Sequence, residues 1–118
     1  MTVFPETYSV EETARLLGVD PRRIKQLIRD RILFTMPAES GGGIPREILV
    51  KGENGWEPLV NLQGTLTLLA DDGYSPEEAA HWLYTMQDEL EETPMEALLK
   101  GRHHRVNAIA SEIGRAHV

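Results

Sequence analysis

The chain has 118 residues, a net charge of −7, and 41% hydrophobic and 26% charged residues, a composition typical of soluble globular proteins that excludes a disordered chain. It contains no cysteine, which excludes a disulfide framework, a cysteine-based zinc site and thiol catalysis. No segment resembling a signal peptide precedes Ser9, and no apolar run is long enough to span a membrane, so we expect a cytoplasmic protein.

Charge is unevenly distributed along the chain. Residues 15–31 carry six basic and two acidic side chains, a local balance of +4. Residues 37–99 carry 13 acidic and two basic side chains, a balance of −11, and residues 100–118 return to +3. Solubility alone does not require this segregation. It is typical of a basic recognition element followed by an acidic body.

The first predicted element after a flexible arm at residues 1–7 is a helix over residues 10–17. Ser9 is suited to cap this helix, with Glu12 three residues later to complete a capping box. Gly18 is placed to end the helix in a left-handed conformation.

A second helix is predicted over residues 21–31. Asp20 provides the cap and Pro21 the first helical position, and an apolar stripe at helical spacing follows: Ile24, Leu27 and Ile28. Only Gly18 and Val19 separate the first helix from the cap of the second. Such a short connection indicates a helix-turn-helix arrangement.

A hairpin of the size of a wing is expected next. Residues 33–36 predict a short strand, residues 37–43 a turn rich in Gly and Pro, and Ile44 the start of the return strand. We expect a short helical turn over residues 45–50, with a linker at residues 51–58.

The second half of the chain predicts helices alone. An apolar helix is expected over residues 59–70, two further helices begin at Ser75-Pro76 and Thr93-Pro94, and a last helix covers about residues 102–114. The predicted fold class is therefore mainly α: a winged helix-turn-helix with a short β-hairpin wing at residues 8–50, a linker at 51–58, and a small helical C-terminal domain at 59–118.

Residues 8–30 resemble the winged helix-turn-helix of excisionase and MerR-like proteins, in the two caps, the Ala14 at the helix crossing, the Leu17-Gly18 end and the Ile/Leu stripe. Over about residues 8–112 the chain is similar to small actinobacterial regulators that join this domain to a helical C-terminal domain. The C-terminal likeness is carried by residues 64–69, 72–75, 79–85, 94–98 and 100–102. The resemblance implies a DNA-binding protein whose second helix enters the major groove.

Double-stranded DNA is accordingly the expected partner, and a nucleoid-associated transcriptional regulator the expected function. Arg22, Arg23 and Gln26 are the candidates for base contacts, because Arg can bond guanine bidentately and Gln can bond adenine in the same way. Lys25 and Arg29 are predicted to hold phosphates, and Arg15 on the first helix is predicted to contact the backbone at the edge of the site.

A second hypothesis is a protein-interaction module with weak or no DNA binding. The acidic C-terminal half favours it, as does the predicted wing tip, which contains Glu39 and neither Arg nor Lys. The pattern of Trp82-Leu83, Pro94, Leu98, Gly101 and Val106 also loosely resembles the partner-binding domain of some antitoxins. The C-terminal helical domain would then bind a protein partner or a second copy of the chain.

No pattern predicts an enzyme, a cofactor or a metal site. The histidines and the nearby acid lack the spacing of metal ligands: His103, His104, His117 and Glu112. The acidic run lacks the spacing of a calcium loop and is predicted to be a solvated surface: Asp88, Glu89, Glu91, Glu92 and Glu96. No serine and histidine are placed as nucleophile and base, so we expect no catalytic residues.

Overall fold

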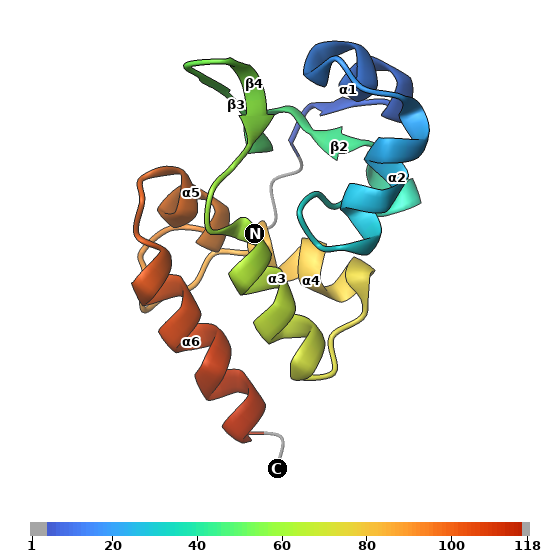
Figure 1. Cartoon of the computed structure of the whole chain (residues 1–118). Coiled ribbons are helices and arrows are strands. Elements are labelled where there is room, and N and C mark those ends of the chain that lie inside the picture. Colours follow the sequence, from blue (N-terminus) through green and yellow to red (C-terminus); the bar gives the residue numbers. More distant parts are fainter. Residues whose placement is uncertain (1–4, 117–118) are drawn as a thin grey trace.

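The computed structural model of the chain describes residues 5–116, and side chains as far as Ile113. Its N-terminal half contains two helices, four short strands and two 3₁₀ turns: β1 (Thr7–Tyr8), α1 (Val10–Leu17), α2 (Pro21–Arg29), η1 (Ala38–Ser40), β2 (Ile44–Pro45), η2 (Arg46–Ile48), β3 (Leu49–Gly52) and β4 (Gly55–Pro58). The C-terminal half contains four helices, α3 (Leu62–Asp71), α4 (Pro76–Leu83), α5 (Pro94–Leu99) and α6 (His103–Ala116) (Figure 1). The predicted mainly α fold class with a small antiparallel hairpin is confirmed, and the arrangement is consistent with a winged helix.

The helix starts lie where the caps predict them. The Ser9 hydroxyl accepts a hydrogen bond from the Glu12 amide at 3.0 Å, and the Glu12 carboxylate accepts one from the Ser9 amide at 2.9 Å. Ser75 and Thr93 begin α4 and α5 with the same reciprocal pair of bonds. Each box satisfies two amides that the helix itself leaves without partners, which explains why the local sequence sets these boundaries.

Helix α2 ends at Arg29, two residues earlier than predicted, in a Schellman motif. The Arg31 amide bonds to the Ile28 carbonyl at 3.1 Å, and the Ile32 amide bonds to the Leu27 carbonyl at 2.9 Å. This pattern requires a left-handed residue between them, and Arg31 fills the position with a φ of 61°. Glycine usually occupies this position, because a side chain there is strained.

The hairpin predicted from residues 33–36 and Ile44 does not form. Residues 33–36 have no regular structure, although Leu33, Phe34 and Met36 are buried, and only the bond from the Met36 amide to the Gly43 carbonyl at 2.8 Å links them to the return segment. The prediction was wrong because a short apolar run is buried here by packing alone, without a strand partner beside it.

Strand β2 pairs instead with β1, in the register Thr7↔Pro45 and Tyr8↔Ile44. Gly43 makes this approach possible: a Cβ atom there would lie 2.6 Å from the Thr7 hydroxyl oxygen, which is too close for any side chain. Thr7, expected in the flexible arm, is therefore part of a sheet.

The β-hairpin of the fold is formed by β3 and β4, in the segment predicted to be a linker. Its register runs from Leu49↔Pro58 to Gly52↔Gly55. The predicted helical turn over residues 45–50 is reduced to the 3₁₀ turn η2 just before β3. Asn54-Gly55 at the tip is a hairpin signal, but most residues of the flanking strands are exposed or only partly buried, and the strands lack an apolar alternation.

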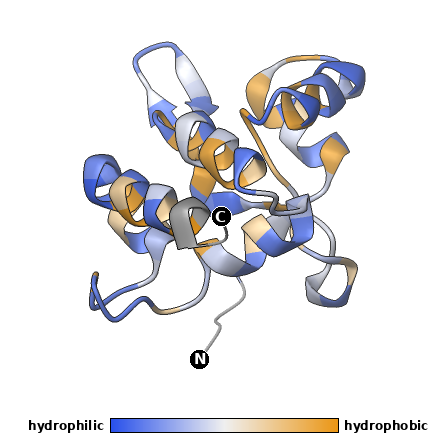
Figure 2. Cartoon of the chain, turned by 90° about the horizontal axis from the view of Figure 1, so that it is seen from below, coloured by the Kyte–Doolittle hydropathy of each residue, from blue (hydrophilic) through white to orange (hydrophobic). Residues whose placement is uncertain are grey.

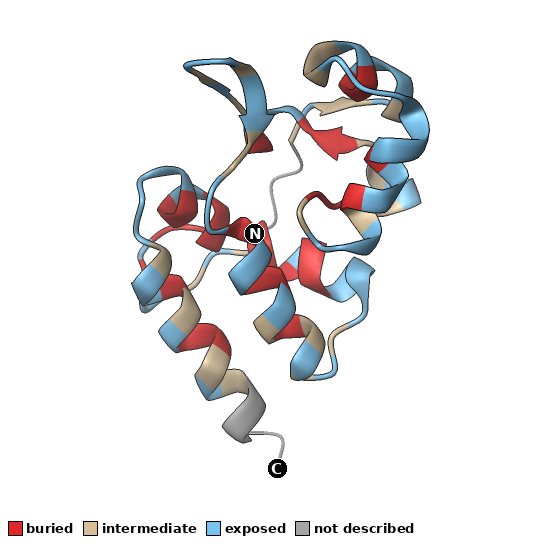
Figure 3. Ribbon diagram, in the orientation of Figure 1, coloured by how far each residue is buried: buried red, intermediate tan, exposed pale blue. Residues whose placement is uncertain are grey.

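One continuous cluster of buried side chains spans both halves of the chain. Residues from each half are fully buried in it, among them Ile24, Ile48, Leu62, Leu83 and Val106. Each helix has an apolar and a polar side, and the buried segments face the centre of the molecule (Figures 2 and 3). The basic helix α2 is therefore held by a core that the C-terminal helices complete.

Within the described residues, two side-chain hydrogen bonds also join the halves. The Tyr84 hydroxyl, at the end of α4, donates to a Glu47 carboxylate oxygen of η2 at 2.7 Å. The Gln63 side-chain amide of α3 donates to the Asp30 carbonyl at the end of α2 at 2.9 Å. The second contact fixes the position of α3 against the end of α2.

Tyr84→Phe is expected to reduce the free energy of unfolding by about 1 kcal/mol at neutral pH, because a partly buried hydrogen bond is lost. Burial, followed by the hydrogen bond to Glu47 and the charge of Glu47, raises the pKa of Tyr84 above the ordinary value of 10.0. Above pH 10 the unfolded state therefore releases a proton that the folded state keeps. This side chain then lowers the free energy of unfolding by up to about 1.4 kcal/mol per pH unit.

Urea unfolding at pH 7 and at several values above pH 10 tests this prediction. The Tyr84→Phe protein should lose stability with rising pH less steeply than the unaltered chain. Tyr74→Phe is the matched control, with a smaller effect of the same sign, because burial also raises the pKa of the half-buried Tyr74. Equal alkaline slopes for the Tyr84→Phe and unaltered proteins would contradict the prediction.

Candidate nucleic-acid interface

The exposed side of α2 carries five of the six residues predicted to contact DNA. Ile24 and Leu27 are buried against the core, and all six predicted residues are exposed: Arg15, Arg22, Arg23, Lys25, Gln26 and Arg29. Arg22, Gln26 and Arg29 follow the spacing i, i+4, i+7, which places them on the helix side opposite the buried stripe. Arg23 and Lys25 flank that line, and Arg15 lies in the last turn of α1.

All three predicted base-contacting side chains already have partners within the protein. The Arg22 Nε atom lies 3.2 Å from an Asp20 carboxylate oxygen, and the same oxygen accepts the Arg22 amide at 2.8 Å. The Arg23 guanidinium donates to the Gln26 side-chain oxygen at 2.9 Å. This bond ties the Gln26 side chain to Arg23, while the Gln26 NH₂ group has no partner among the described residues.

Asp20 places a negative charge at the start of the basic helix. Its bonds from the Arg22 amide and then the Arg22 side chain hold the pKa of the Asp20 carboxyl below its usual range. The carboxylate is therefore charged at neutral pH and offsets part of the field of Arg22. The ion pair is exposed, so it adds little to stability.

Arg15 stands beside an acidic side chain as well. The pKa of Glu12 is lowered first by its backbone and side-chain hydrogen bonds to Ser9, and to a smaller extent by Arg46 and Arg15. The charge of Glu12 opposes that of Arg15, so the net positive potential of this surface is centred on α2.

The hairpin β3–β4 offers little positive charge. Lys51 is exposed opposite the exposed Trp56, but Glu53 and Glu57 lie on the same hairpin, which is therefore net acidic. Arg46, in the preceding turn, is engaged elsewhere: its guanidinium lies 4.7 Å from the Tyr8 ring centroid and donates to the Thr7 carbonyl at 3.3 Å.

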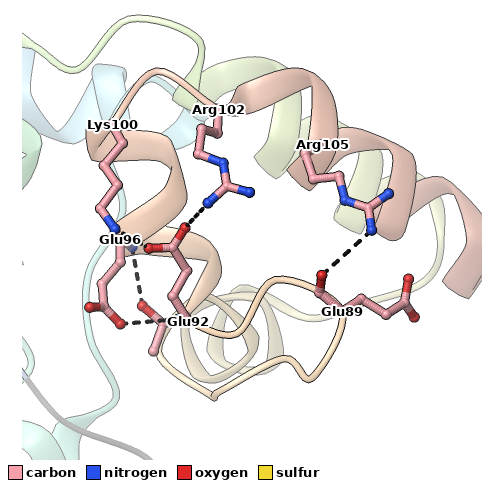
Figure 4. A network of polar contacts seen from close by, with 7 residues as sticks. Glu89, Glu92, Glu96, Lys100, Arg102 and Arg105 are labelled. Carbon is pink, nitrogen blue, oxygen red and sulfur yellow. Dashed lines mark hydrogen bonds and ion pairs between the residues drawn. The ribbon is translucent and has the colours of Figure 1, made fainter.

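The basic residues around the end of α5 and the start of α6 form contacts with other residues of the protein. Glu92 is buried, and its two carboxylate oxygens accept Lys100 Nζ at 2.6 Å and Arg102 Nη1 at 2.7 Å (Figure 4). Arg105 reaches the Glu89 carbonyl at 3.5 Å. The prediction that Glu92 belongs to a solvated acidic surface was wrong, because two cations from later in the chain converge on its carboxylate.

Sequence reasoning missed Arg31 as well. It is exposed directly after α2, and among the described residues the guanidinium groups of Arg31 and Arg29 have no hydrogen-bond or ion-pair partner. The sequence did contain a signal for this residue, because Arg31 extends the basic run of α2. Its left-handed backbone conformation could be seen only in the structure.

The histidines lie at the start of α6. The rings of His103 and His104 are 4.1 Å apart, with His103 half-buried and His104 exposed. Across residues 5–116, no three side chains among His, Asp and Glu are grouped in a way that could hold a metal ion. His117 lies outside the described residues. Within the same part of the chain, no helix combines the length and apolar character needed to cross a membrane.

The class that these features define is a mainly helical protein, consistent with a winged helix, whose first helices expose a basic face. Residues 59–114 match the model of a family described as the Rv2175c C-terminal domain of unknown function. The chain is 32% identical over 84 residues to the DNA-binding protein Rv2175c of Mycobacterium tuberculosis, an alignment that covers 71% of this chain and 56% of the relative. The chain thus spans little more than half the length of that relative.

The solved NMR structure of Rv2175c has a similar fold. The TM-score is 0.77 at 26% identity, with 97% of this chain and 84% of that chain covered. The likeness includes both the N-terminal half, with α1, α2 and the hairpin, and the C-terminal helices.

Proposed function

We propose that this protein binds double-stranded DNA and acts as a transcriptional regulator rather than as an enzyme, in the cytoplasm and in association with the nucleoid. The observation that carries the proposal is the row of exposed cationic side chains on the capped helix α2, after a short turn from α1. The similarity to a DNA-binding protein, Rv2175c, supports it. The proposed DNA-binding unit extends through the hairpin to residue 58, with a helical domain after it.

In this proposal α2 lies in the major groove, as in the excisionase and MerR-like proteins that the sequence resembles. Arg22 and the unpaired NH₂ group of Gln26 contact base edges, while Arg23 keeps Gln26 in position through the bond of 2.9 Å. Lys25 and Arg29 neutralise phosphates. The hairpin, being net acidic, contributes little to phosphate binding.

Two-dimensional NMR of the amides during titration with a duplex tests the location of the interface. The amides of α2 and the last turn of α1 are expected to shift first, while those of α6 stay unchanged. Shifts concentrated on the C-terminal helices, or none at low salt with any duplex, would contradict the proposal.

A protein-interaction module is the second candidate, and the hairpin is the observation that favours it. Trp56 and Val60 are among the most exposed large hydrophobic residues, and the acidic hairpin suits a basic protein partner better than DNA. Trp56→Ala separates the candidates: it should leave duplex affinity within about twofold if α2 binds DNA, and should abolish capture of a protein partner if the hairpin is the interface.

Asp20→Asn is expected to increase duplex affinity several-fold. Asparagine caps a helix about as well as aspartate, so α2 keeps its start, while the negative charge beside Arg22 is removed. Fluorescence anisotropy with a labelled duplex measures the change, and the thermal midpoint checks that the cap remains. Asp30→Asn, at the opposite end of α2, is the matched control with the same charge change. Unchanged binding by Asp20→Asn would contradict the prediction, and weaker binding by this variant alone would show that Arg22 needs its carboxylate partner.

A further inference from the structure

An apolar groove lies between the end of α2 and the C-terminal helices, with a volume of about 340 Å³. Its floor is buried apolar surface from Leu33, Phe34, Leu66 and Ala79. In Figure 1 the segment that follows α2 lies above α4 and beside α3, which places this groove at the junction of the two halves. The volume is at the lower end of the range for small-molecule sites.

Two cations stand at the rim of this groove. Arg29 and Arg31 both line it and are exposed, and within residues 5–116 neither guanidinium has a hydrogen-bond or ion-pair partner. An apolar cavity with two free cations at one edge is complementary to a ligand with an apolar body and one anionic end. Guanidinium groups bind carboxylates through paired hydrogen bonds, which makes a carboxylate the best-matched head group.

The backbone of Arg31 gives an independent indication that its side chain has a role. It holds the left-handed position of the Schellman motif at a φ of 61°, where glycine would be free of strain. Strained non-glycine residues that persist in a fold tend to lie at functional sites. A glycine at this position would relieve the backbone strain at the end of α2. Arg31 keeps that strain and provides a guanidinium at the edge of the groove.

We propose that this groove binds a small amphipathic carboxylate, with its apolar body on Leu33, Phe34 and Ala79 and its carboxylate on Arg29 and Arg31. The ligand would compete with DNA for Arg29. This last step rests on the proposed function, whereas binding of the ligand itself does not. Linkage then requires ligand and DNA to weaken each other by the same factor.

Calorimetric titration of the full chain with decanoate, below its micelle concentration, tests the groove without DNA. Decanol has the same apolar body without charge, and acetate has the charge without the body. Decanoate is expected to bind at least tenfold more tightly than either, and amide shifts should localise it to the end of α2 and to α3 and α4. Equal binding of decanol, shifts elsewhere, or no decanoate binding would overturn the proposal.

The Arg31→Gly variant tests the role of this side chain in ligand binding separately from its effect on folding. This variant is expected to keep or raise the thermal midpoint, because glycine relieves the left-handed residue, while decanoate binding weakens at least tenfold. Ala70→Leu, which fills the groove from α3, should also abolish binding with both cations intact. Arg23→Ala, an exposed arginine of α2 outside the groove, is the control and should bind decanoate normally. Retained affinity in Arg31→Gly would overturn the proposal.

Anisotropy with a duplex then tests the competition. Decanoate should weaken duplex binding by the unaltered protein and have little effect on Arg31→Gly. If decanoate binds in the groove but no duplex binds at all, the ligand site stands and the proposed function fails. If duplex binds and decanoate does not, the ligand site fails and the proposed function stands.

Discussion

Replacing Arg22 and Arg23 together by alanine should reduce duplex affinity by about 100-fold or more. The change removes one proposed base contact and the guanidinium that positions the Gln26 amide. Each well-made bidentate contact to a base contributes about 1–3 kcal/mol, and a loss of about 1.4 kcal/mol corresponds to tenfold in affinity. Both side chains are exposed, so the thermal midpoint should change little.

Fluorescence anisotropy with one labelled duplex measures this loss. Lys51→Ala with Arg105→Ala is the control, because it removes the same number of positive charges from the hairpin and from α6. That control should lose less than about threefold. Equal losses in the two double variants would mean that net charge, and not the face of α2, determines the affinity.

The single variants refine the assignment. Arg22→Ala should relax the preference for one duplex sequence over another, whereas Lys25→Ala should weaken binding to all sequences alike and reduce the salt slope by about one.

Replacing both cations around Glu92 should destabilise the fold by about 3 kcal/mol. The double variant Lys100→Met/Arg102→Leu leaves a buried carboxylate without the two bonds, at 2.6 and 2.7 Å, that it accepts in the unaltered chain. Removing the partners of a buried charge costs about 3–5 kcal/mol, and the lower end applies because both cations are partly exposed. Each single variant should cost much less, since one partner remains.

Urea unfolding measures this effect, and a third substitution tests its cause. Adding Glu92→Leu to the double variant should recover most of the lost stability, because the unpaired charge is then gone. Arg105→Leu is the matched control, since its contact to the Glu89 carbonyl at 3.5 Å is long and exposed. A triple variant no more stable than the double one would show that the cost comes from packing instead.

The helices could be predicted from local sequence because their boundaries depend on short-range chemistry. The capping boxes at Ser9, Ser75 and Thr93 and the proline after Asp20 set the helix starts within a few residues. The end of α2 was misplaced because Arg31 takes a backbone conformation that the sequence would assign to glycine.

The strands could not be predicted in the same way, since their partners lie far apart in the chain. β2 pairs with β1, and the contact depends on the missing side chain of Gly43 beside Thr7. The β3–β4 hairpin carried one local signal, Asn54-Gly55, but its exposed strands have no apolar alternation to identify them.

The exposure of the candidate side chains on α2 was predictable from the sequence, whereas the contacts that they make were not. Helical spacing identified the exposed side of α2, because the buried stripe fixes the opposite side. The pairing of Arg23 with Gln26 and the capture of Lys100 and Arg102 by Glu92 depend on side-chain geometry. The second of these contacts pairs two cations of the C-terminal half with a buried carboxylate.

The most direct test of the central claim is an anisotropy titration of the unaltered protein with a duplex of random sequence at about 50 and 200 mM salt. If α2 and its neighbours neutralise about four phosphates, affinity should fall by roughly 100-fold over this range. Binding that is absent at low salt, or that does not change with salt, would contradict DNA binding through the basic face of α2.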